Sequence, residues 1–446
     1  MMTQNDLLLA FYGDDFTGST DALEFLHRAG AKTVLFMEPP GAEQLKRYEG
    51  LQAIGVAGKS RSMRPDNMER ELRPVFTALR ALGAPHIHYK VCSTFDSSPT
   101  TGSIGKAIDI GASIFPASFV PILGGAPALG RYCVFGNLFA RMGIGSNGTI
   151  YRLDRHPSMS RHPVTPSDES DLRLHLGRQT KKKMGLLDIL QIAKPAAEAH
   201  QALKDIINSG AEAILFDALY EEQMAGIGRL IDAYASPGHT LFSVGSSGIE
   251  MALGAWWAAQ GKLVPPQGWA APGRTAPLLV ASGSCSPVTT AQVARACSQG
   301  FKEIAMDAGT VAANGCAPLM LQAYVAEATA LIKQGYSVII HTGKGQPHTM
   351  AQAATAQVLG TALGLIVKEV VKQTAVKRLV IAGGDTASYA ARALGIESVE
   401  MIAPLSPGAP LCRAHAPGSP VDGIEINLKG GQVGSDNYFG NVLEGI

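Results

Sequence analysis

Apolar runs of strand length alternate with amphipathic helix patterns along most of this chain. Residues 7–12 form the first apolar run, and Ala22, Phe25, Leu26 and Ala29 then recur at the spacing of one helix face. Further runs typical of strands occupy residues 32–37, 53–57, 87–91, 213–217, 241–245, 278–282, 336–340 and 378–382. Strands that alternate with helices predict an α/β fold of mostly parallel sheets flanked by helices in three layers, α/β/α.

A change of composition divides the pattern into two parts. Residues 264–277 are rich in Pro and Gly, which is typical of a linker. The length of 446 residues suits two or three domains. We therefore predict an N-terminal α/β domain at residues 1–263, a linker at 264–277 and a C-terminal α/β domain at 278–446.

Charge and cysteine usage narrow the class of protein. The chain has 38 Lys and Arg against 37 Asp and Glu, a net charge of +1, which gives no support for a nucleic-acid or anionic-membrane partner. No apolar run approaches the roughly 18 residues of a membrane span. The N-terminus is polar, unlike a signal peptide. The six cysteines are scattered, never at Cys-x-x-Cys spacing. We expect a cytoplasmic enzyme with reduced thiols.

Two adjacent carboxylates follow the first apolar run. A strand, a sharp turn and a helix place Asp14 and Asp15 at the carboxyl edge of a sheet, where open α/β folds bind ligands. Their alternative role is to cap the helix, for which Thr17 or Ser19 is also suitable. One carboxylate is enough for a cap, so the second indicates a function.

Polar side chains at two later strand ends could bind the same ligand as Asp14 and Asp15. Arg61 follows one strand, and Lys90, Ser93 and Thr94 follow another, with Asp96 close behind. Cations that hold a carboxylate, hydroxyls that bind a polyol and acids that accept a proton suit a small hydroxy acid. Solvation at the surface is the alternative for Arg61 and Lys90.

Glycine-rich turns mark the strand ends of the C-terminal half. They lie at residues 283–284, 343–345, 383–386 and 429–431. Glycines let the backbone approach a polyphosphate, and N–H groups at helix starts favour anions. The two common nucleotide motifs, Gly-x-x-x-x-Gly-Lys-Ser/Thr and Gly-x-Gly-x-x-Gly after a strand, are absent. Four such turns together favour a nucleotide site.

The histidines do not favour a metal site. His156 and His162 are six residues apart and have no neighbouring Cys. We predict no protein-bound metal; His162 with Thr165 could instead contact a substrate.

With these residues in view, the chain resembles the four-carbon acid sugar kinase family over nearly its whole length. Members of that family have two α/β domains and phosphorylate sugar acids with ATP. The motifs that carry the resemblance are Asp14-Asp15-Phe16-Thr17-Gly18 with Asp21, the loop from Lys90 to Ser97, Gly283-Ser284-Cys285-Ser286-Pro287 with Thr289 and Gln292, Gly383-Gly384-Asp385-Thr386, and Leu428-Lys429-Gly430-Gly431.

The resemblance implies an acid-sugar site in the N-terminal domain and an ATP site, with Mg²⁺, in the C-terminal domain. The residues implied for the acid sugar are Asp15, Arg61, Lys90, Val91, Cys92 and Ser93. Those implied for ATP are Ser284, Gly383, Gly384, Asp385, Thr386 and Gly430, to which we add Ser286 and Gly431 from the same turns. The partners implied are these two small molecules; a homo-oligomer is compatible with the sequence.

One loop departs from the threonate and erythronate branch of the family. Cys92 stands where that branch has Asp, and Asp96 where it has Arg. The loop is closer to the 3-oxo-tetronate kinase branch, although Ser103 replaces an expected Asn. The stretch from His156 to Thr165 makes the 3-oxo-isoapionate kinase branch a rival. The substrate is therefore a 3-oxo-tetronate-like acid, with 3-oxo-isoapionate, threonate and erythronate as alternatives.

The residues then fit one mechanism and leave two rivals. Arg61 and Lys90 would hold the substrate carboxylate or developing charge, and Asp15 or Asp14 would accept the hydroxyl proton. A phosphatase with an aspartate nucleophile expects Asp-x-Asp-x-Thr, which the spacing here does not match. A non-catalytic sensor of sugar acids or nucleotides is the other rival.

Overall fold

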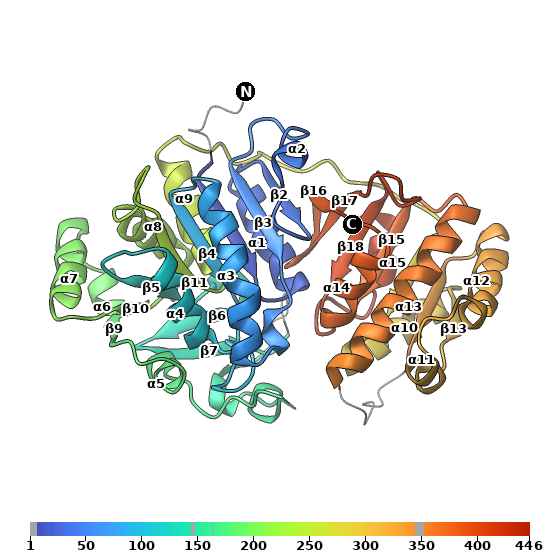
Figure 1. The fold of residues 1–446 in the computed structure, drawn as a ribbon, viewed down its shortest axis with the longest axis horizontal. Coiled ribbons are helices and arrows are strands. Elements are labelled where there is room, and N and C mark those ends of the chain that lie inside the picture. Colours follow the sequence, from blue (N-terminus) through green and yellow to red (C-terminus); the bar gives the residue numbers. More distant parts are fainter. Residues whose placement is uncertain (1–6, 144–147, 163, 344–351) are drawn as a thin grey trace. The chain divides into compact units, whose positions relative to one another are not determined.

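The computed structural model describes residues 7–143, 148–162, 164–343 and 352–446, and it divides into two compact units. Residues 1–34 and 39–267 form the first unit, and residues 35–38 and 268–446 form the second. Figure 1 shows the ribbon of each unit, with helices flanking its strands.

The first unit is built on a mostly parallel sheet. In spatial order its strands are β2 (Thr33–Phe36, of which residues 33 and 34 belong to this unit), β3 (Ala53–Ala57), β1 (Leu9–Gly13), β4 (His86–Lys90), β11 (Leu241–Gly245), β5 (Val120–Leu123), β10 (Ala213–Phe216) and β9 (Met184–Leu187). Each pair from β3 to β9 is parallel. A separate antiparallel sheet contains β6 (Arg131–Val134), β7 (Asn137–Arg141) and β8 (Ile150–Arg152).

Two groups of helices cover this sheet. Helix α9 (Gly248–Ala259) contacts both α1 (Phe16–Arg28) and α8 (Met224–Asp232), and α3 (Pro65–Ala81) contacts α4 (Ile104–Ile114). The other helices of this unit are the short α2 (Ala42–Leu45), α5 (Leu172–Gly177) and α6 (Ile189–Ile192), and the longer α7 (Ala196–Asn208). The groups follow from amphipathic sequences such as that of α3, whose Met68, Leu72, Val75 and Leu79 are all buried.

Helix α1 is buried on more than the apolar face that the sequence predicts. Ala22 and Leu26 are buried as expected, whereas Phe25 and Ala29 are only half-buried. The polar side chains Asp21 and Glu24 are buried instead. The helix packs against both β3 and α9, so a single stripe does not describe it. Gly30 ends the helix at φ +95, as the sequence predicts.

The second unit is also built on a mostly parallel sheet. In spatial order its strands are β13 (Lys302–Ala305), β14 (Val338–His341), β12 (Leu278–Ser282), β15 (Arg378–Ala382), β18 (Glu425–Lys429), β17 (Ala409–His415) and β16 (Ser398–Ser406). The pairs from β13 to β18 are parallel, and β17 is antiparallel to both of its neighbours. The three-layer α/β prediction is therefore confirmed for both units.

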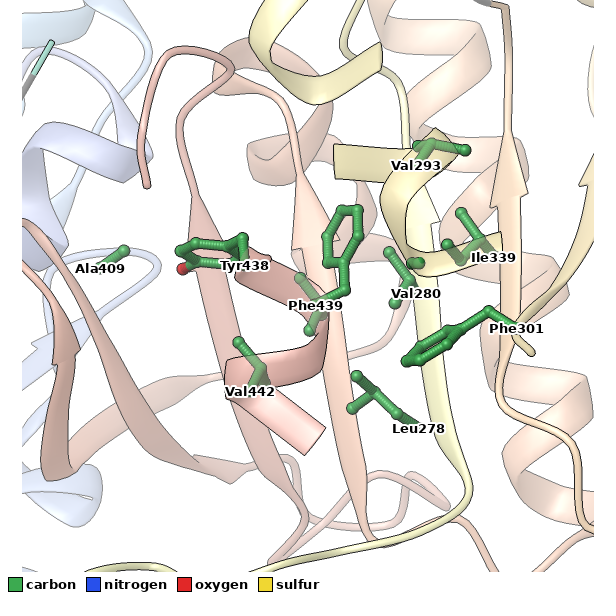
Figure 2. Packing of buried hydrophobic residues seen from close by; sticks show 11 residues of the cluster. Leu278, Val280, Val293, Phe301, Ile339, Ala409, Tyr438, Phe439 and Val442 are labelled. Carbon is green, nitrogen blue, oxygen red and sulfur yellow. The ribbon is translucent and has the colours of Figure 1, made fainter. Parts of the chain in front are cut away.

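An apolar cluster holds helices to this second sheet. Helices α11 (Ala308–Asn314), α12 (Pro318–Lys333), α13 (Gln352–Gln373) and α14 (Gly384–Ala393) form one contacting group, and α10 (Pro287–Ser298) with α15 (Tyr438–Glu444) forms another. Figure 2 shows Tyr438, Phe439 and Val442 of α15 beside Val280 of β12 and Val293 of α10. Burying each such side chain contributes about 1.5–3 kcal/mol.

Candidate active site

The turn between β1 and α1 is built around Asp15. Its carboxylate caps the helix, with Oδ1 accepting a bond from Gly18 N at 2.7 Å and Oδ2 one from the Thr17 hydroxyl at 3.0 Å. Of the capping candidates that the sequence left open, the structure selects Asp15 over Thr17 and Ser19. Asp15 is the last extended residue before the helix, so its side chain reaches the first free N–H groups. The Ser19 hydroxyl instead donates to the Asp15 carbonyl at 2.6 Å.

Arg61 joins the two adjacent carboxylates. It lies in the short 3-10 turn Ser60–Ser62 that follows β3, the strand beside β1. Its guanidinium donates twice to Asp14, from Nη2 at 2.7 Å and Nε at 3.2 Å, and once to Asp15, from Nη1 at 2.7 Å. Bidentate bonding of this kind fixes both partners. Asp14 therefore holds Arg61 in place, while Asp15 both caps the helix and contacts Arg61.

Burial makes the charges of this trio interdependent. Burial raises the pKa of Asp14 above its usual value, although Arg61 opposes the shift. Burial acts to lower the pKa of Arg61, but Asp14 and Asp15 outweigh it and the pKa lies well above its ordinary value. The guanidinium is thus a fixed positive charge beneath the β1 turn.

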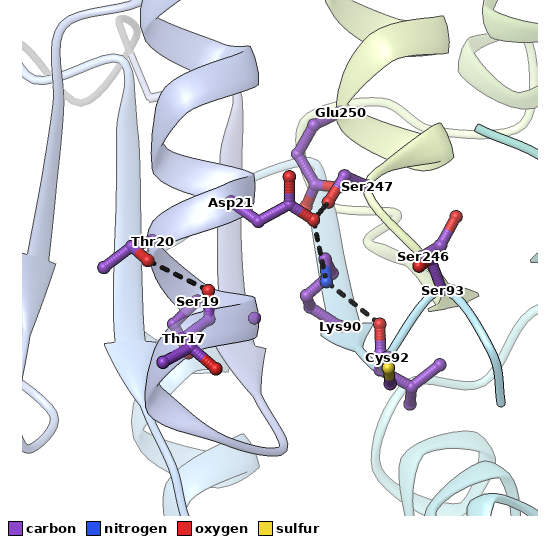
Figure 3. Close-up of polar contacts among 12 residues, drawn as sticks. Thr17, Ser19, Thr20, Asp21, Lys90, Cys92, Ser93, Ser246, Ser247 and Glu250 are labelled. Atoms are coloured by element: carbon purple, nitrogen blue, oxygen red, sulfur yellow. Dashed lines mark hydrogen bonds and ion pairs between the residues drawn. The ribbon is translucent and has the colours of Figure 1, made fainter. Parts of the chain in front are cut away.

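Lys90, at the end of β4, places a second cation beside the first. Its Nζ donates to the Val91 carbonyl at 2.9 Å and lies 3.4 Å from Asp21 Oδ2. Figure 3 shows Lys90 beside Asp21. Burial would lower the pKa of Lys90, but Asp21, Glu250 and Asp14 together raise it. The ammonium is therefore protonated although it is only 1% exposed.

Lys90 ends a row of polar side chains along one face of a buried strand. His86, His88 and Lys90 alternate with apolar residues, and each meets one acid from a helix. The three pairs are His86 Nε2 with Asp232 Oδ1 of α8 at 2.9 Å, His88 Nδ1 with Glu250 Oε1 of α9 at 2.6 Å, and Lys90 with Asp21 of α1.

Sequence reasoning did not assign a role to the acids of this row. Asp21 was expected only as part of the family motif, and the sequence predicted no role for Glu250. Two signals were available: the alternating polar residues in His86–Lys90, and a single acid in the otherwise apolar helix Gly248–Ala259. Figure 3 shows Ser247 beside Asp21, to which its hydroxyl donates.

Gly18 keeps open the space into which these charges point. A Cβ atom at this position would lie 2.5 Å from Asp15 Oδ1, 3.4 Å from Lys90 Nζ and 3.5 Å from Arg61 Nη2. The structure therefore brings Asp14, Asp15, Arg61 and Lys90 together around the start of α1. A carboxylate or hydroxyl that entered this space would meet two cations and an acid.

The polar side chains of the loop after β4 form hydrogen bonds with one another and with Arg131. The Cys92 thiol lies 3.0 Å from the Thr94 hydroxyl, which donates to Asp96 Oδ1 at 2.8 Å. Ser93 Oγ accepts a bond from Arg131 Nε at 3.2 Å. Burial raises the pKa of Cys92 to about 11, so it is a neutral thiol at ordinary pH.

Arg131 is a cation that the sequence did not indicate. It comes from β6 and is 6% exposed, and nothing in its neighbourhood along the chain distinguishes it from a surface arginine. Only the packing of the small antiparallel sheet places it against Ser93.

In the second unit, three predicted glycine turns leave the sheet at one edge. Ser282 of β12 is in register with Ala382 of β15, which is in register with Lys429 of β18. A Cβ on Gly283 would lie 2.4 Å from Thr386 Oγ1, and one on Gly431 would lie 2.6 Å from Ser284 Oγ. Only glycine allows the turns to approach so closely.

Side-chain hydroxyls tie these turns together. Ser286 caps α10 by accepting a bond from Thr289 N at 3.1 Å, and its hydroxyl donates to the Gly431 carbonyl. Gly383, at φ +127, precedes α14, and no side chain caps that helix. Backbone N–H groups at the start of α14 therefore face this edge and suit an anion.

Some predicted residues contribute only backbone or lie outside the description. Val91 offers its carbonyl to Lys90, and Gly430 accepts a bond from Val433 N at 3.2 Å. Gly384 is the first residue of α14. The side chain of Asp385 and residues Lys344 and Gly345 lie outside the described part of the structure.

The polar stretch at residues 152–171 forms local contacts. His162 Nδ1 lies 3.0 Å from Thr165 Oγ1, and His156 Nδ1 accepts a bond from Ser158 N at 3.2 Å. Across the described residues, no three His, Cys, Asp or Glu side chains gather in a way that could hold a metal ion. No described helix has the length and apolarity to cross a membrane.

Two family models and several curated relatives match the chain. A family model described as a sugar-binding N-terminal domain matches residues 9–253, and one described as a nucleotide-binding C-terminal domain matches residues 279–439. Over 98% of the chain and 94% of the relative, the sequence is 42% identical to a 3-oxo-isoapionate kinase from Paraburkholderia graminis. It is 30% identical to a 3-oxo-tetronate kinase from Methylobacterium radiotolerans, over 98% of the chain and 99% of the relative.

Solved structures share the fold. A crystal structure from Salmonella typhimurium LT2, provisionally described as a tRNA synthase, is 26% identical with a TM-score of 0.75 and covers 98% of both chains. One from Haemophilus influenzae is 22% identical with a TM-score of 0.69 and covers 97% of this chain and 98% of that chain.

Proposed function

Because the chain belongs to the four-carbon acid sugar kinase family, we propose that it transfers the γ-phosphoryl group of ATP to a hydroxyl of 3-oxo-isoapionate. The 42% identity to a kinase of that name supports this acceptor. The 3-oxo-tetronate kinases at 30% and 27% identity make 3-oxo-tetronate the second candidate. Threonate and erythronate rank lower because Cys92 and Asp96 depart from that branch.

The observation that carries the proposal is the buried constellation of Asp14, Asp15, Arg61 and Lys90. Two cations and two carboxylates meet at one strand edge, and Gly18 leaves room beside them. A substrate carboxylate would bind Arg61 or Lys90, and an Asp carboxylate would accept the proton of the attacking hydroxyl. We assign that base to Asp15, because its Oδ1 borders the space beside Gly18, whereas Asp14 is not among the atoms nearest to that space and holds Arg61 through both oxygens.

On the donor side, we assign the phosphates to the turns at Ser284–Ser286, Gly383–Thr386 and Gly430–Gly431. The convergence of these turns and the uncapped start of α14 support the assignment. ATP would be used as its Mg²⁺ complex, since Mg²⁺ usually binds through substrate phosphates and keeps several water ligands. Phosphoryl transfer then depends on positioning and on charge stabilisation.

An ADP-release assay over the four acids tests the proposal. We expect saturable release with 3-oxo-isoapionate or 3-oxo-tetronate and little with threonate or erythronate. If the purified chain binds MgATP but releases ADP with none of the four acids, it is not a kinase of these acids, and the result favours a sensor.

The variant Asp15→Asn tests the assignment of the base. Asn caps helices about as well as Asp, so the fold should be retained while the proton acceptor is lost. We expect kcat to fall by about 10²–10⁴-fold with nucleotide affinity unchanged. The matched variant Asp14→Asn should instead mainly raise KM for the acid, because it releases Arg61. Near-normal turnover of Asp15→Asn would remove Asp15 from the mechanism.

A further inference from the structure

Lys429 is a fully buried lysine at the carboxyl end of β18. Its Nζ donates to the Thr289 hydroxyl at 3.1 Å and lies 5.3 Å from the centre of the Tyr438 ring. Figure 2 shows Tyr438 among the apolar side chains that join α15 to the sheet. The ammonium thus lies beside an apolar cluster, with one hydroxyl and one ring face as its neighbours.

Lys429 has no counter-ion among the described residues. Tyr438 is the titratable group that it contacts, and burial lowers the pKa of Lys429 to about 7. The charged groups and histidines on the strands and helices around it are Arg378 on β15, Glu425 on β18, Arg413 and His415 on β17, Arg295 on α10, Arg392 on α14 and Glu444 on α15. Glu425 is paired with Arg378 at 2.7 Å at the other end of the two strands. The structure does not describe the side chain of Asp385 on α14.

A short chain of hydrogen bonds connects Lys429 to the turns assigned to the nucleotide. The Thr289 hydroxyl, which accepts from Lys429, donates to the Gly431 carbonyl at 2.9 Å. The Ser286 hydroxyl donates to the same carbonyl. Lys429 therefore lies directly beneath the turns that contain Ser284, Ser286 and Gly431.

We propose that the phosphate chain of the nucleotide is the counter-ion of Lys429, so that nucleotide binding is coupled to the uptake of one proton by this side chain. The proposal rests on the nucleotide site proposed above. An anion beside a buried amine favours its charged form, and the proton comes from the solvent to Nζ. Lys429 acts as a positioning residue, because its charged form holds Thr289, and through it Gly431, beneath the phosphates.

Two other groups in this region, the nucleotide phosphate and Asp385, could also change their protonation when the nucleotide binds. The nucleotide itself titrates, but a phosphate has its second pKa near about 6, so it is deprotonated at pH 8. Asp385 belongs to the Gly383–Thr386 turn and could also respond to bound phosphate. The experiment must therefore separate Lys429 from both.

Calorimetry of nucleotide binding tests the coupling. The Mg²⁺ complex of a non-hydrolysable ATP analogue is titrated into the full chain at pH 8, in buffers of different ionisation enthalpy. We expect uptake of close to one proton per nucleotide by the wild type and by Asp385→Asn, and close to none by Lys429→Met. Between pH 7.5 and pH 9 the wild-type affinity should fall by up to tenfold per pH unit, whereas that of Lys429→Met should stay flat.

Two further variants keep the result interpretable. Lys302 on β13 also lies over a tyrosine ring, 4.6 Å from that of Tyr336, but it is exposed, so Lys302→Met should take up protons as the wild type does. Lys429→Arg keeps a permanent charge and should bind nucleotide without proton uptake. Equal uptake by the wild type and Lys429→Met, or buffer-independent heat for the wild type, would overturn the proposal. Absence of nucleotide binding by the wild type would instead overturn the nucleotide site itself.

Discussion

Two buried lysines, one in each unit, end parallel strands at the edges where the substrates are expected. Lys90 ends β4 and Lys429 ends β18, and neither is more than 1% exposed. Lys90 has Asp21, Glu250 and Asp14 near it, and its pKa is raised. Lys429 has no such partner among the described residues, and burial lowers its pKa to about 7.

The difference shows that burial alone does not decide the charge of a lysine. The acid-sugar unit supplies its own carboxylates, so its cations are charged and positioned before any substrate arrives. The nucleotide unit leaves its lysine without a counter-ion, which the phosphates are proposed to supply. On these proposals, the first site is preorganised, whereas the second becomes fully charged only when the nucleotide binds.

The same substitution in both lysines should affect stability in opposite directions. Lys90→Met leaves the carboxylates of Asp21 and Glu250 buried beside an apolar side chain, which should lower the free energy of unfolding by about 3–5 kcal/mol. Lys429→Met replaces an unpaired amine in an apolar site, so it should leave that free energy unchanged or raise it at pH 7. Urea unfolding followed by tryptophan fluorescence for the first unit, and by circular dichroism for both units, measures the two effects.

The positions of the tryptophans make this measurement informative. Trp256 and Trp257 are in α9 of the first unit, so they report the loss expected for Lys90→Met. Equal losses in the two variants would mean that the carboxylates around Lys90 do not distinguish it from Lys429.

The pH dependence of stability should also separate the two lysines. An unfolded lysine loses its proton near about pH 10.4, whereas Lys429 in the folded chain loses it near pH 7. Between these values the unfolded state binds more protons, so this group makes the folded state more stable as the pH rises. Relative to Lys429→Met, the free energy of unfolding of the wild type should rise by about 2 kcal/mol between pH 7.5 and pH 9.

Lys90 provides the control for this measurement. Its pKa is raised, so its proton stays bound in both states across the same range, and Arg61 behaves likewise. A parallel change of stability with pH in the wild type and in Lys429→Met would show that Lys429 is not the titrating group.

The sequence predicted the architecture and the approximate site more fully than the contacts within it. Alternating apolar patterns and glycine turns predicted both sheets, because main-chain periodicity and turn chemistry are local properties. The adjacency of Asp14, Asp15, Arg61 and Lys90 was also predictable, since carboxyl ends of neighbouring parallel strands share an edge. Their roles in the site stay proposals.

The contacts that were missed all depend on packing between distant segments. Glu250 reaches His88 across 162 positions of the chain, and Arg131 reaches Ser93 only through the small antiparallel sheet. The capping role of Asp15 was one of several alternatives, because several residues of that turn could cap a helix and only the backbone conformation selects one. The sequence predicted Lys429 only as part of a glycine turn, because its neighbours in sequence do not indicate that its side chain is buried.

The smallest effect that we expect tests whether the acids around Lys90 position it or only stabilise the fold. Asp21→Asn removes the carboxylate nearest to Lys90 but keeps a side chain that can bond to Ser247. The pKa of Lys90 should fall, so the alkaline limb of kcat/KM for the acid should move to lower pH, by about one pH unit for each 1.4 kcal/mol of lost attraction. Asp232→Asn is the matched control, because Asp232 bonds to His86 in the same row of β4. That variant should lower stability and leave the pH profile in place. If both variants shift the profile equally, or neither does, Asp21 has no specific role in the charge of Lys90, and the remaining acids Glu250 and Asp14 are sufficient.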